Sequence, residues 1–384
     1  MSLTDEIKEY ALDLGFCKVG ITDAENVDFF QKILDKRKDN YLPWINGRIF
    51  QSDPKTELAD CKSVIALAYD YANIHFPEEL TPLVGRAYLS RSYVPRSDSI
   101  CGARLQLFET FLQKKGLKVC QASLNLPLRQ FARKAGVTSF GKNNFSYVDG
   151  VGSFVILYAF LVDQVLEYDE PQKMSKCPEN CHRCMDACPT GAIIEPFHLK
   201  PSRCVGYNNW MRRGKAGTKF DEVVPREIRP LLGTRIHGCD ACQEACPRNW
   251  KKIKEDNFRP KDPLLELIKD HLNLKDILLM NDAYYQKWVY PIMYNYLRDK
   301  KYFQRNAAIA MGNTGDESYI PVLAEAILTE DPLVRLHCAW ALGRFDSTEA
   351  REALIKALHQ EKDEGVLREI RDALSGQFME KQNK

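Results

Sequence analysis

The feature that most constrains this chain is a set of eight cysteines within residues 177–246. The first run is Cys177-x3-Cys181-x2-Cys184-x3-Cys188-Pro189, and after the lone Cys204 comes Cys239-x2-Cys242-x3-Cys246-Pro247. The remaining cysteines stand singly, as small buried hydrophobic residues do in a reducing compartment: Cys17, Cys61, Cys101, Cys120 and Cys338. Such clustering in a cytosolic chain indicates bound metal and argues against disulfides.

The rest of the composition is consistent with a cytosolic protein. No apolar run reaches the roughly eighteen residues that a membrane span needs. The first fifteen residues, MSLTDEIKEYALDLG, predict a capped amphipathic helix and contain no signal-peptide core, so we expect a cytoplasmic location. The net charge is only +2, but residues 200–260 carry 14 Lys and Arg against 7 Asp and Glu. That local excess is either a solvated face or a surface that meets phosphates.

The cysteine spacing favours two [4Fe–4S] clusters. Runs that end in Cys-Pro are typical of bacterial-type ferredoxins, in which the fourth cysteine of a run ligates the other cluster. This rule gives the first cluster Cys177, Cys181, Cys184 and Cys246, and the second Cys188, Cys204, Cys239 and Cys242. Structural zinc is the alternative, but it rarely uses two Cys-x3-Cys-Pro endings. The x3 gap after Cys177 replaces the usual x2. His182 and His237 lie beside the runs, where an exposed loop position is expected for each.

Three regions are expected along the 384 residues, which are too many for one ordinary core. Residues 1–170 mix predicted strands at 61–71 and 152–162 with a predicted helix at 101–116, an α+β pattern. Residues 171–260 are rich in Cys, Pro and Gly and would be held by their metals, as a ferredoxin-like double-cluster domain. Residues 261–384 read as entirely helical.

The helical region contains an internal repeat. "AIAMGNTGD" (308–316) returns as "AWALGRFDS" (339–347), thirty-one residues later, and "YIPVLAEAIL" (319–328) is echoed by "AREALIKALH" (350–359). Helix pairs at this period resemble HEAT repeats, which stack into a solenoid. About two repeats are too few to stand alone, so this region should pack against the preceding domain.

Together these motifs resemble the epoxyqueuosine reductase family over nearly the whole chain. The matching segments are "CHRCMDACPTGAI", "GCDACQEACP" with Asn249 just beyond, "RNAAIAMGN…VRLHCAWALGR", and "RKAGVTSFGKNN…GSFVILY" (133–158). The resemblance implies an N-terminal α/β cobalamin-type domain, a double-cluster domain and a HEAT-like end. It also implies electron flow from the clusters to the cobalt of bound cobalamin, and removal of the epoxide oxygen from a tRNA nucleoside, the last step to queuosine.

The resemblance also implies site residues and partners. Lys142, Asn143, Ser146 and Ser153 would contact cobalamin. The partners would be a tRNA anticodon stem-loop, or another substrate, and an external low-potential electron donor. The chain is expected to act as a monomer with no membrane partner.

Several positions depart from the family pattern. Counting back from Gly141-Lys142-Asn143, the aspartate that the family proposes as proton donor falls on Ala122. Three further segments differ: Asp98-Ser99-Ile100, Ala159 or Phe160, and "NNWMRRG" (208–214). Asp149 and Tyr147 are the nearest ionisable replacements for the missing donor, although "YVDG" also reads as an ordinary turn.

Three classes of function follow. The leading one is a cobalamin- and iron–sulfur-dependent reductase of this family. The second is a divergent paralogue that transfers electrons or reduces a corrinoid without acting on epoxyqueuosine, which Ala122 favours. The third, a metal-stabilised nucleic-acid scaffold, ranks last because two cross-ligated clusters are an elaborate way to build a scaffold.

Overall fold

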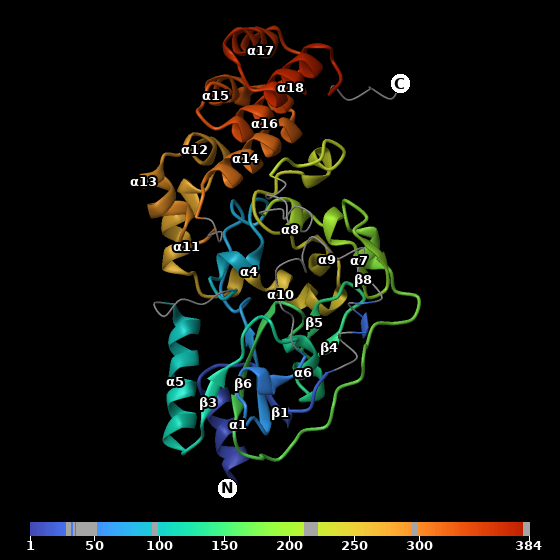
Figure 1. Cartoon of the computed structure of the whole chain (residues 1–384), viewed down its shortest axis with the longest axis vertical. Coiled ribbons are helices and arrows are strands. Elements are labelled where there is room, and N and C mark those ends of the chain that lie inside the picture. The colour runs from blue at the N-terminus through green and yellow to red at the C-terminus, as the bar shows by residue number, and fades with distance from the viewer. Residues whose placement is uncertain are drawn as a thin grey trace.

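The computed structural model describes residues 1–27, 32–33, 35, 52–93, 99–210, 222–293 and 298–378. Figure 1 shows three regions along the long axis: a sheet with helices at the N-terminal end, the cysteine-rich segment in the middle, and a stack of helices at the C-terminal end. Asp98 and residues 211–214, which belong to the departures from the family pattern, lie outside the described residues.

The N-terminal region is built on a four-stranded sheet of order β1-β2-β6-β3, in which every neighbouring pair is antiparallel. Its strands are β1 (Lys18–Asp23), β2 (Ser63–Asp70), β3 (Val119–Gln121) and β6 (Val155–Val162). Two small hairpins accompany it: β4 (Ser139–Phe140) with β5 (Ser146–Tyr147), and β7 (Ile193–Glu195) with β8 (His198–Leu199). The predicted strands at 61–71 and 152–162 are confirmed as β2 and β6, and the antiparallel sheet agrees with an α+β class.

Helices cover both faces of this sheet, which explains why β2 is an unbroken apolar run. Ile65, Leu67 and Tyr69 belong to the core shared with α1 (Leu3–Asp13) and α5 (Ile100–Lys114). The alternate residues Ala66 and Ala68 pack with α6 (Leu128–Lys134) on the other face. The predicted helix at 101–116 is therefore α5, and the predicted N-terminal helix begins with a capping box between Ser2 and Asp5.

Short elements dominate the cysteine-rich region and its surroundings. The α-helices are α4 (Arg86–Leu89), α7 (Arg183–Asp186), α8 (Val205–Asn208), α9 (Ala241–Glu244) and α10 (Trp250–Lys254). The 3₁₀ turns are Pro54–Thr56, Pro201–Arg203, Arg229–Leu232, Pro247–Asn249, Asp256–Phe258, Lys269–His271 and Glu317–Tyr319. Single-turn helices bury little surface, so this region depends on its neighbours and on bound groups.

The C-terminal helices are α11 (Pro263–Ile268), α12 (Leu274–Leu279), α13 (Asp282–Tyr284), a π-helical turn (Tyr285–Val289), α14 (Lys301–Thr314), α15 (Ile320–Ala326), α16 (Pro332–Leu342), α17 (Thr348–Gln360) and α18 (Glu364–Leu374). The repeated glycine marks where successive repeats touch. A Cβ on Gly312 of α14 would lie 2.8 Å from Ala341 Cα of α16, and one on Gly343 would lie 2.6 Å from Ala373 Cβ of α18. The thirty-one-residue repeat is thus a repeat of close helix contacts.

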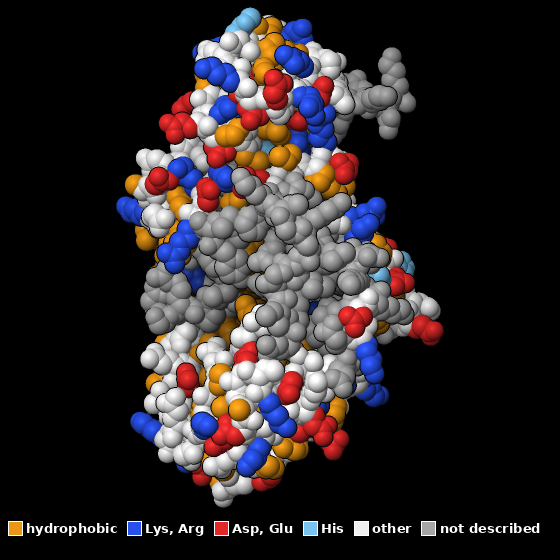
Figure 2. Space-filling model, viewed as in Figure 1, with side chains coloured by type: hydrophobic (Ala, Val, Ile, Leu, Met, Phe, Trp, Pro, Cys, Tyr) orange, Lys and Arg blue, Asp and Glu red, His pale blue; other side chains and the backbone are white. Residues whose placement is uncertain are grey.

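A single cluster of buried apolar side chains runs from the sheet region into the helical stack. The repeats therefore pack against the rest of the chain, as predicted. Among the described residues, no helix has the length and apolar character needed to cross a membrane. Figure 2 shows Lys and Arg side chains interspersed with Asp and Glu over both ends of the molecule. The domain boundaries at 170 and 260 stay predictions.

Candidate iron–sulfur centre

The cysteines gather in two groups of four. Burial, together with the neighbouring thiols of Cys177, Cys246 and Cys181, raises the pKa of the Cys184 thiol to about 11. In the second group, burial and the thiols of Cys239, Cys204 and Cys188 raise the pKa of Cys242 well above its usual value. These are the two sets of neighbours that the crossed-ligand rule predicts. Because burial and neighbouring thiols disfavour the bare thiolates, a bound metal centre would have to stabilise them when the protons leave.

Two helical turns bring the runs together. Cys184 lies in α7 and Cys242 in α9, and the two turns pack against each other. Each is followed by a Cys-Pro pair, Cys188 after α7 and Cys246 after α9. Because the turns are adjacent, the last cysteine of each run reaches the group formed mainly by the other run.

Backbone amides point at sulfurs of the second group. The Ala192 N–H donates to Cys188 Sγ at 3.2 Å. Amides of Tyr207 and Gly206 hydrogen-bond to Cys204 and oppose the rise in its pKa that burial causes. Hydrogen bonds of this kind stabilise thiolates and tune the reduction potential of a cluster.

Lys142 faces the loop between the first two cysteines. Its Nζ donates to the carbonyl oxygens of Pro178 at 2.8 Å, Glu179 at 2.5 Å and Cys181 at 2.9 Å. The residue is only 9% exposed. The side chain predicted to contact cobalamin is therefore engaged with the first cysteine run.

Asn143 and Tyr147 lie between the two runs. Asn143 Nδ2 donates to the Cys242 carbonyl at 3.2 Å and to the Tyr147 hydroxyl at 3.0 Å. Burial, followed by a hydrogen bond with the Cys246 thiol, raises the pKa of Tyr147. The guanidinium of Arg248 lies 4.4 Å from the centre of the Tyr147 ring. Tyr147 is thus a buried neighbour of a cysteine in the first group.

Ser153 joins the sheet region to the second cysteine run. Its N–H donates to Asn249 Oδ1 at 2.8 Å and its hydroxyl donates to Gln243 Oε1 at 3.0 Å, while Asn249 Nδ2 donates back to the hydroxyl at 2.8 Å. The Ser146 hydroxyl is buried and has no hydrogen-bond partner among the described residues. Asp149 is half exposed and pairs with Lys176 and, at 3.3 Å, with Arg248.

Comparison with known proteins places this geometry in a family. A model of the 4Fe-4S double cluster binding domain matches residues 176–249, and a model of HEAT repeats matches residues 291–375. The epoxyqueuosine reductase of Bacillus subtilis (strain 168) is 30% identical over 382 residues, covering 96% of this chain and 94% of its own length. That of Escherichia coli (strain K12) is 30% identical over 403 residues, covering 97% of each. The chain belongs to the epoxyqueuosine reductase family.

Solved structures agree with this assignment. Epoxyqueuosine reductase with a tRNA-Tyr epoxyqueuosine-modified stem loop superposes with a TM-score of 0.82 at 27% identity, covering 97% of this chain and 98% of the other. The Bacillus subtilis enzyme, solved with the loop of its catalytic aspartate swung out of the active site, also gives 0.82, at 28% identity and the same coverage. The predicted fold class, the double-cluster domain and the HEAT-like end are confirmed.

The thiol arrangement fits two four-iron clusters. Among the residues that the structure describes, no three Cys, His, Asp or Glu side chains converge as closely as one metal ion requires. The fit rests on the two sets of four neighbouring thiols, one around Cys184 and one around Cys242. The assignment of each cysteine to a cluster stays a prediction that these neighbour sets support.

The predicted cobalamin contacts fit less well. The polar ends of Lys142, Asn143 and Ser153 are committed to the cysteine-rich region, which leaves Ser146 as the one of the four with a buried hydroxyl lacking a described partner. In this structure the Gly-Lys-Asn and Gly-Ser segments connect the N-terminal region to the cysteine-rich region.

Ala122 lies in an apolar environment. It is 9% exposed and packs with Phe131 of α6, Val64 and Leu161 in a small cluster on that face of the sheet. Its amide donates to the Ala159 carbonyl at 2.9 Å. The next residue, Ser123, donates its amide to Glu57 Oε2 at 2.8 Å. Glu57 is thus a carboxylate one contact away from the predicted aspartate position, and the sequence offered no motif to find it.

Two residues of α14 that were not among the predicted site residues bind the segment that follows Cys204. Arg305, fully buried, donates to the carbonyls of Glu222 at 2.6 Å and Trp210 at 2.9 Å. Asn306 donates to the carbonyls of Asn209 at 2.5 Å and Ile236 at 2.8 Å. All four acceptor carbonyls lie in the segment between Cys204 and Cys239, two cysteines of the second group. The contacts therefore fasten α14 to the chain that joins these two cysteines. The "RN" of the matched repeat motif was the available signal.

The two histidines beside the runs differ from each other. His182 is exposed, as expected, and pairs with Asp186. The exposed position expected for His237 is wrong: it is 1% exposed, and its ring lies 4.1 Å from that of Tyr88 and 5.4 Å from that of Phe303. Burial lowers its pKa to about 3. Aromatic neighbours from distant segments, which no local pattern reveals, enclose it.

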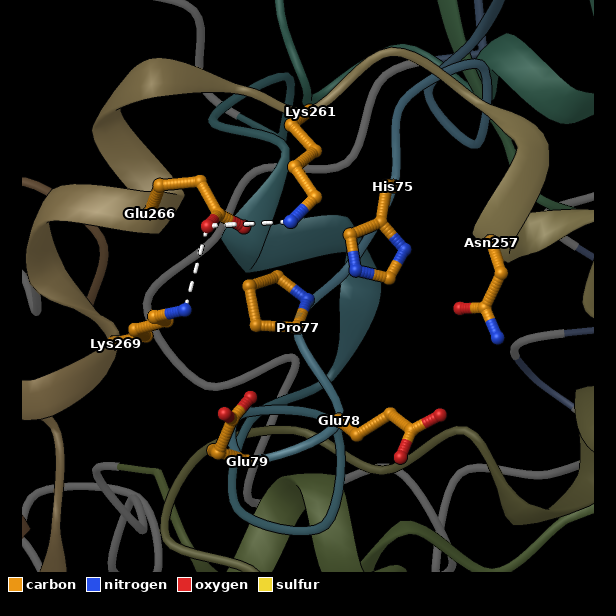
Figure 3. A pocket seen from close by; sticks show the side chains of 8 residues that line it. All are labelled: His75, Pro77, Glu78, Glu79, Asn257, Lys261, Glu266 and Lys269. Carbon is orange, nitrogen blue, oxygen red and sulfur yellow. Dashed lines mark hydrogen bonds and ion pairs between the residues drawn. The ribbon is translucent and has the colours of Figure 1, made fainter.

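A polar pocket lies where residues 75–79 meet residues 257–269 (Figure 3). Several of its charges are paired: Glu266 lies 3.3 Å from Lys269 Nζ and 3.7 Å from Lys261 Nζ, and His75 Nδ1 lies 2.9 Å from Asp256 beside the pocket. None of the lining residues is a predicted site residue or a cysteine of the two groups. The contact between His75 and Asp256 beside the pocket joins the chain just before the helical stack to the N-terminal region.

Proposed function

We propose that this protein is a reductase that acts on epoxyqueuosine in tRNA or on a closely related substrate, with electrons supplied through two [4Fe–4S] clusters. The observation that carries the proposal is the joint match of all three regions, over 97% of the chain, to an epoxyqueuosine reductase solved with a modified tRNA stem loop. The two thiol groups lie between the sheet region and the helical stack. Electrons from an external low-potential donor would enter there.

Cobalamin is the electron acceptor that the resemblance implies, and a bound corrinoid would supply a reducible cobalt. We assign no contact to it, because three of the four predicted contacts serve the cysteine-rich region. The residues of this chain have a defined part in the reaction: eight thiolates hold the clusters, and Lys142, Asn143 and Ser153 fix the sheet region against them.

The helical stack would hold the tRNA through its phosphates, which basic side chains on the surface of the stack are suited to contact. Figure 2 shows Lys and Arg on this part of the surface, mixed with acidic residues. Mixed charge favours a shaped contact with one stem loop over general attraction to nucleic acid.

The decisive assay uses tRNA from a strain that lacks the reductase. Anaerobically reconstituted protein with added cobalamin and a chemical reductant is incubated with this tRNA, and nucleosides are analysed for queuosine by mass spectrometry. Cys184→Ala should abolish turnover, whereas Cys120→Ser, outside both thiol groups, should not. Turnover that survives Cys184→Ala would contradict a cluster-dependent reaction.

A second function has its own support. General acid catalysis typically contributes about 10²–10⁴-fold, and Ala122 cannot donate a proton. On this second function, reduction of epoxyqueuosine itself would be weak or absent, as in a divergent paralogue that reduces a corrinoid or a different substrate. Reduced clusters that are reoxidised by cob(II)alamin, with no queuosine formed, would favour this alternative. Turnover equal to that of the Bacillus subtilis relative would refute it and make Tyr147, Asp149 and Glu57 the candidates for the acid.

A further inference from the structure

The loop between Cys177 and Cys181 is one residue longer than the spacing usual in ferredoxins, and Lys142 is bound to it. Three carbonyl oxygens of this loop converge on Lys142 Nζ within 2.5–2.9 Å, so all three of its N–H groups have an acceptor. The lysine is 9% exposed, and it comes from the N-terminal region, thirty-six or more residues earlier in the chain.

The backbone around Lys142 is fixed independently of its side chain. The Phe197 amide donates to the Lys142 carbonyl at 2.8 Å, and the Phe140 amide donates to the Met174 carbonyl at 2.9 Å. Asn143, the next residue, holds the Cys242 carbonyl. The backbone that carries Lys142 is therefore held beside the cysteine-rich region by bonds that do not involve its side chain, which keeps Nζ within reach of the Cys177–Cys181 loop.

We propose that Lys142 is a positioning residue for the first cluster: it shapes the Cys177–Cys181 loop around the cluster and stabilises the reduced cluster with its charge. The longer loop leaves backbone carbonyls turned inward, and the ammonium satisfies them. A thiolate loop shaped in this way lets both Cys177 and Cys181 face the group that contains Cys184.

The electrostatic part follows from charge balance. Reduction adds one electron from an external low-potential donor to the cluster; no bond forms or breaks, and no proton is needed. The cluster becomes more negative by one charge in a site of low dielectric, where a buried cation has its largest effect. Lys142 would therefore raise the midpoint potential of a cluster held by the first thiol group more than that of one held by the second, because its three hydrogen bonds go to the loop of the first group.

The test compares three variants of the full chain after anaerobic reconstitution. Lys142→Met removes the charge and the hydrogen bonds but keeps an unbranched side chain. Lys142→Arg keeps the charge. Lys176→Met removes the cation directly before Cys177 in the sequence, but one that is about a third exposed and paired with Asp149, so solvent already screens it. Iron and sulfide content are measured first, and midpoint potentials then follow from potentiometric titration monitored by electron paramagnetic resonance.

Signals are assigned with Cys177→Ser and Cys204→Ser, which perturb the first and second cluster respectively. For Lys142→Met we expect a lower midpoint potential of the first cluster alone, or loss of that cluster with about half of the iron retained. Lys142→Arg and Lys176→Met should leave the potentials close to those of the native protein.

Three outcomes would overturn the proposal. The first is full iron content in Lys142→Met with both potentials unchanged. The second is an equal shift of both clusters. The third is an Arg variant that lowers the potential as much as the Met variant, which would show that charge is not the cause. If Lys142→Met fails to fold, Lys142→Gln, which also removes the charge, takes its place in the comparison with Lys142→Arg. The proposal concerns the clusters alone, so it stands or falls independently of activity on tRNA.

Discussion

Removing the carboxylate of Glu369 should destabilise the attachment of the helical stack by about 3–5 kcal/mol. Glu369 lies on α18 and accepts hydrogen bonds from two arginines of the cysteine-rich region. Arg229 Nη1 donates to Oε1 at 2.6 Å, and Arg226 donates to Oε2 through Nε at 3.1 Å and Nη2 at 2.6 Å. Glu369 is 3% exposed and Arg229 1% exposed, so the pair is shielded from water.

The size of the stability loss depends on which charged side chain loses its partner. Arg226 retains Asp372 at 2.7 Å after the change. Among the described residues, Arg229 then keeps the Val224 carbonyl at 2.8 Å, the face of Trp340, whose centre is 5.7 Å from the guanidinium carbon, and the weaker attraction of Glu227. An uncompensated buried charge is what makes breaking such a pair costly, whereas exposed pairs contribute about 0–1 kcal/mol.

Urea unfolding of Glu369→Gln, followed by tryptophan fluorescence, measures the effect, since Trp340 lies beside Arg229. The matched control is Asp60→Asn, which breaks an exposed pair with Lys118. Replacing both partners by apolar residues, as Arg229→Met with Glu369→Leu, should recover most of the lost stability because no buried charge remains unpaired. If Glu369→Gln costs no more than Asp60→Asn, or the double variant is no better than the single one, this account of the interface is wrong.

Three further predictions concern pH, the family's aspartate position and a cluster neighbour. Burial, with two nearby arginines, holds the pKa of His337 well below its usual value, so only the unfolded chain takes up this proton as the pH falls through about 6.5. The free energy of unfolding should drop by about 1.4 kcal/mol between about pH 7.5 and about pH 5.5, and His337→Gln should remove that part of the slope in denaturation curves. Ala122→Asp should lose about 1–3 kcal/mol of stability in urea by placing a carboxyl in an apolar cluster, and nucleoside mass spectrometry should show little restored epoxyqueuosine reduction. Tyr147→Phe should keep its full iron content and lower the midpoint potential of one cluster, because it removes a hydrogen bond to Cys246; an unchanged potential would show that this contact has no electronic effect.

The sequence was most informative where chemistry depends on neighbours along the chain. Cysteine spacing predicted the two neighbour sets, because the turns that carry Cys184 and Cys242 are each set by a few adjacent residues and end at a proline. The apolar run of β2 predicted a buried strand, and the structure shows packing on both of its faces. The repeat predicted stacked helices, and the structure explains its glycines as contact points between repeats.

Contacts between distant segments could not be predicted in the same way. The motif around Lys142 and Asn143 was recognised, but its side chains contact loops thirty-six to ninety-nine residues away, and no local pattern names those partners. Arg305 likewise stands in a matched motif while its acceptors are backbone carbonyls, which any sequence provides. His237 is enclosed by aromatic rings from two other regions, so its burial has no local signature.

The position of Ala122 shows why its replacement cannot be considered alone. The sheet face that it occupies meets α6 closely: a Cβ on Gly20 would lie 1.9 Å from the Ala135 carbonyl, so the backbones leave no space between them. Phe131 fills the room beside Ala122. An acid at this position would need either water or a hydrogen-bond partner, and the apolar packing of α6 supplies neither. On the prediction that Ala122 stands at the family's aspartate position, restoring a proton donor there would require repacking that face of the sheet as well as changing one residue.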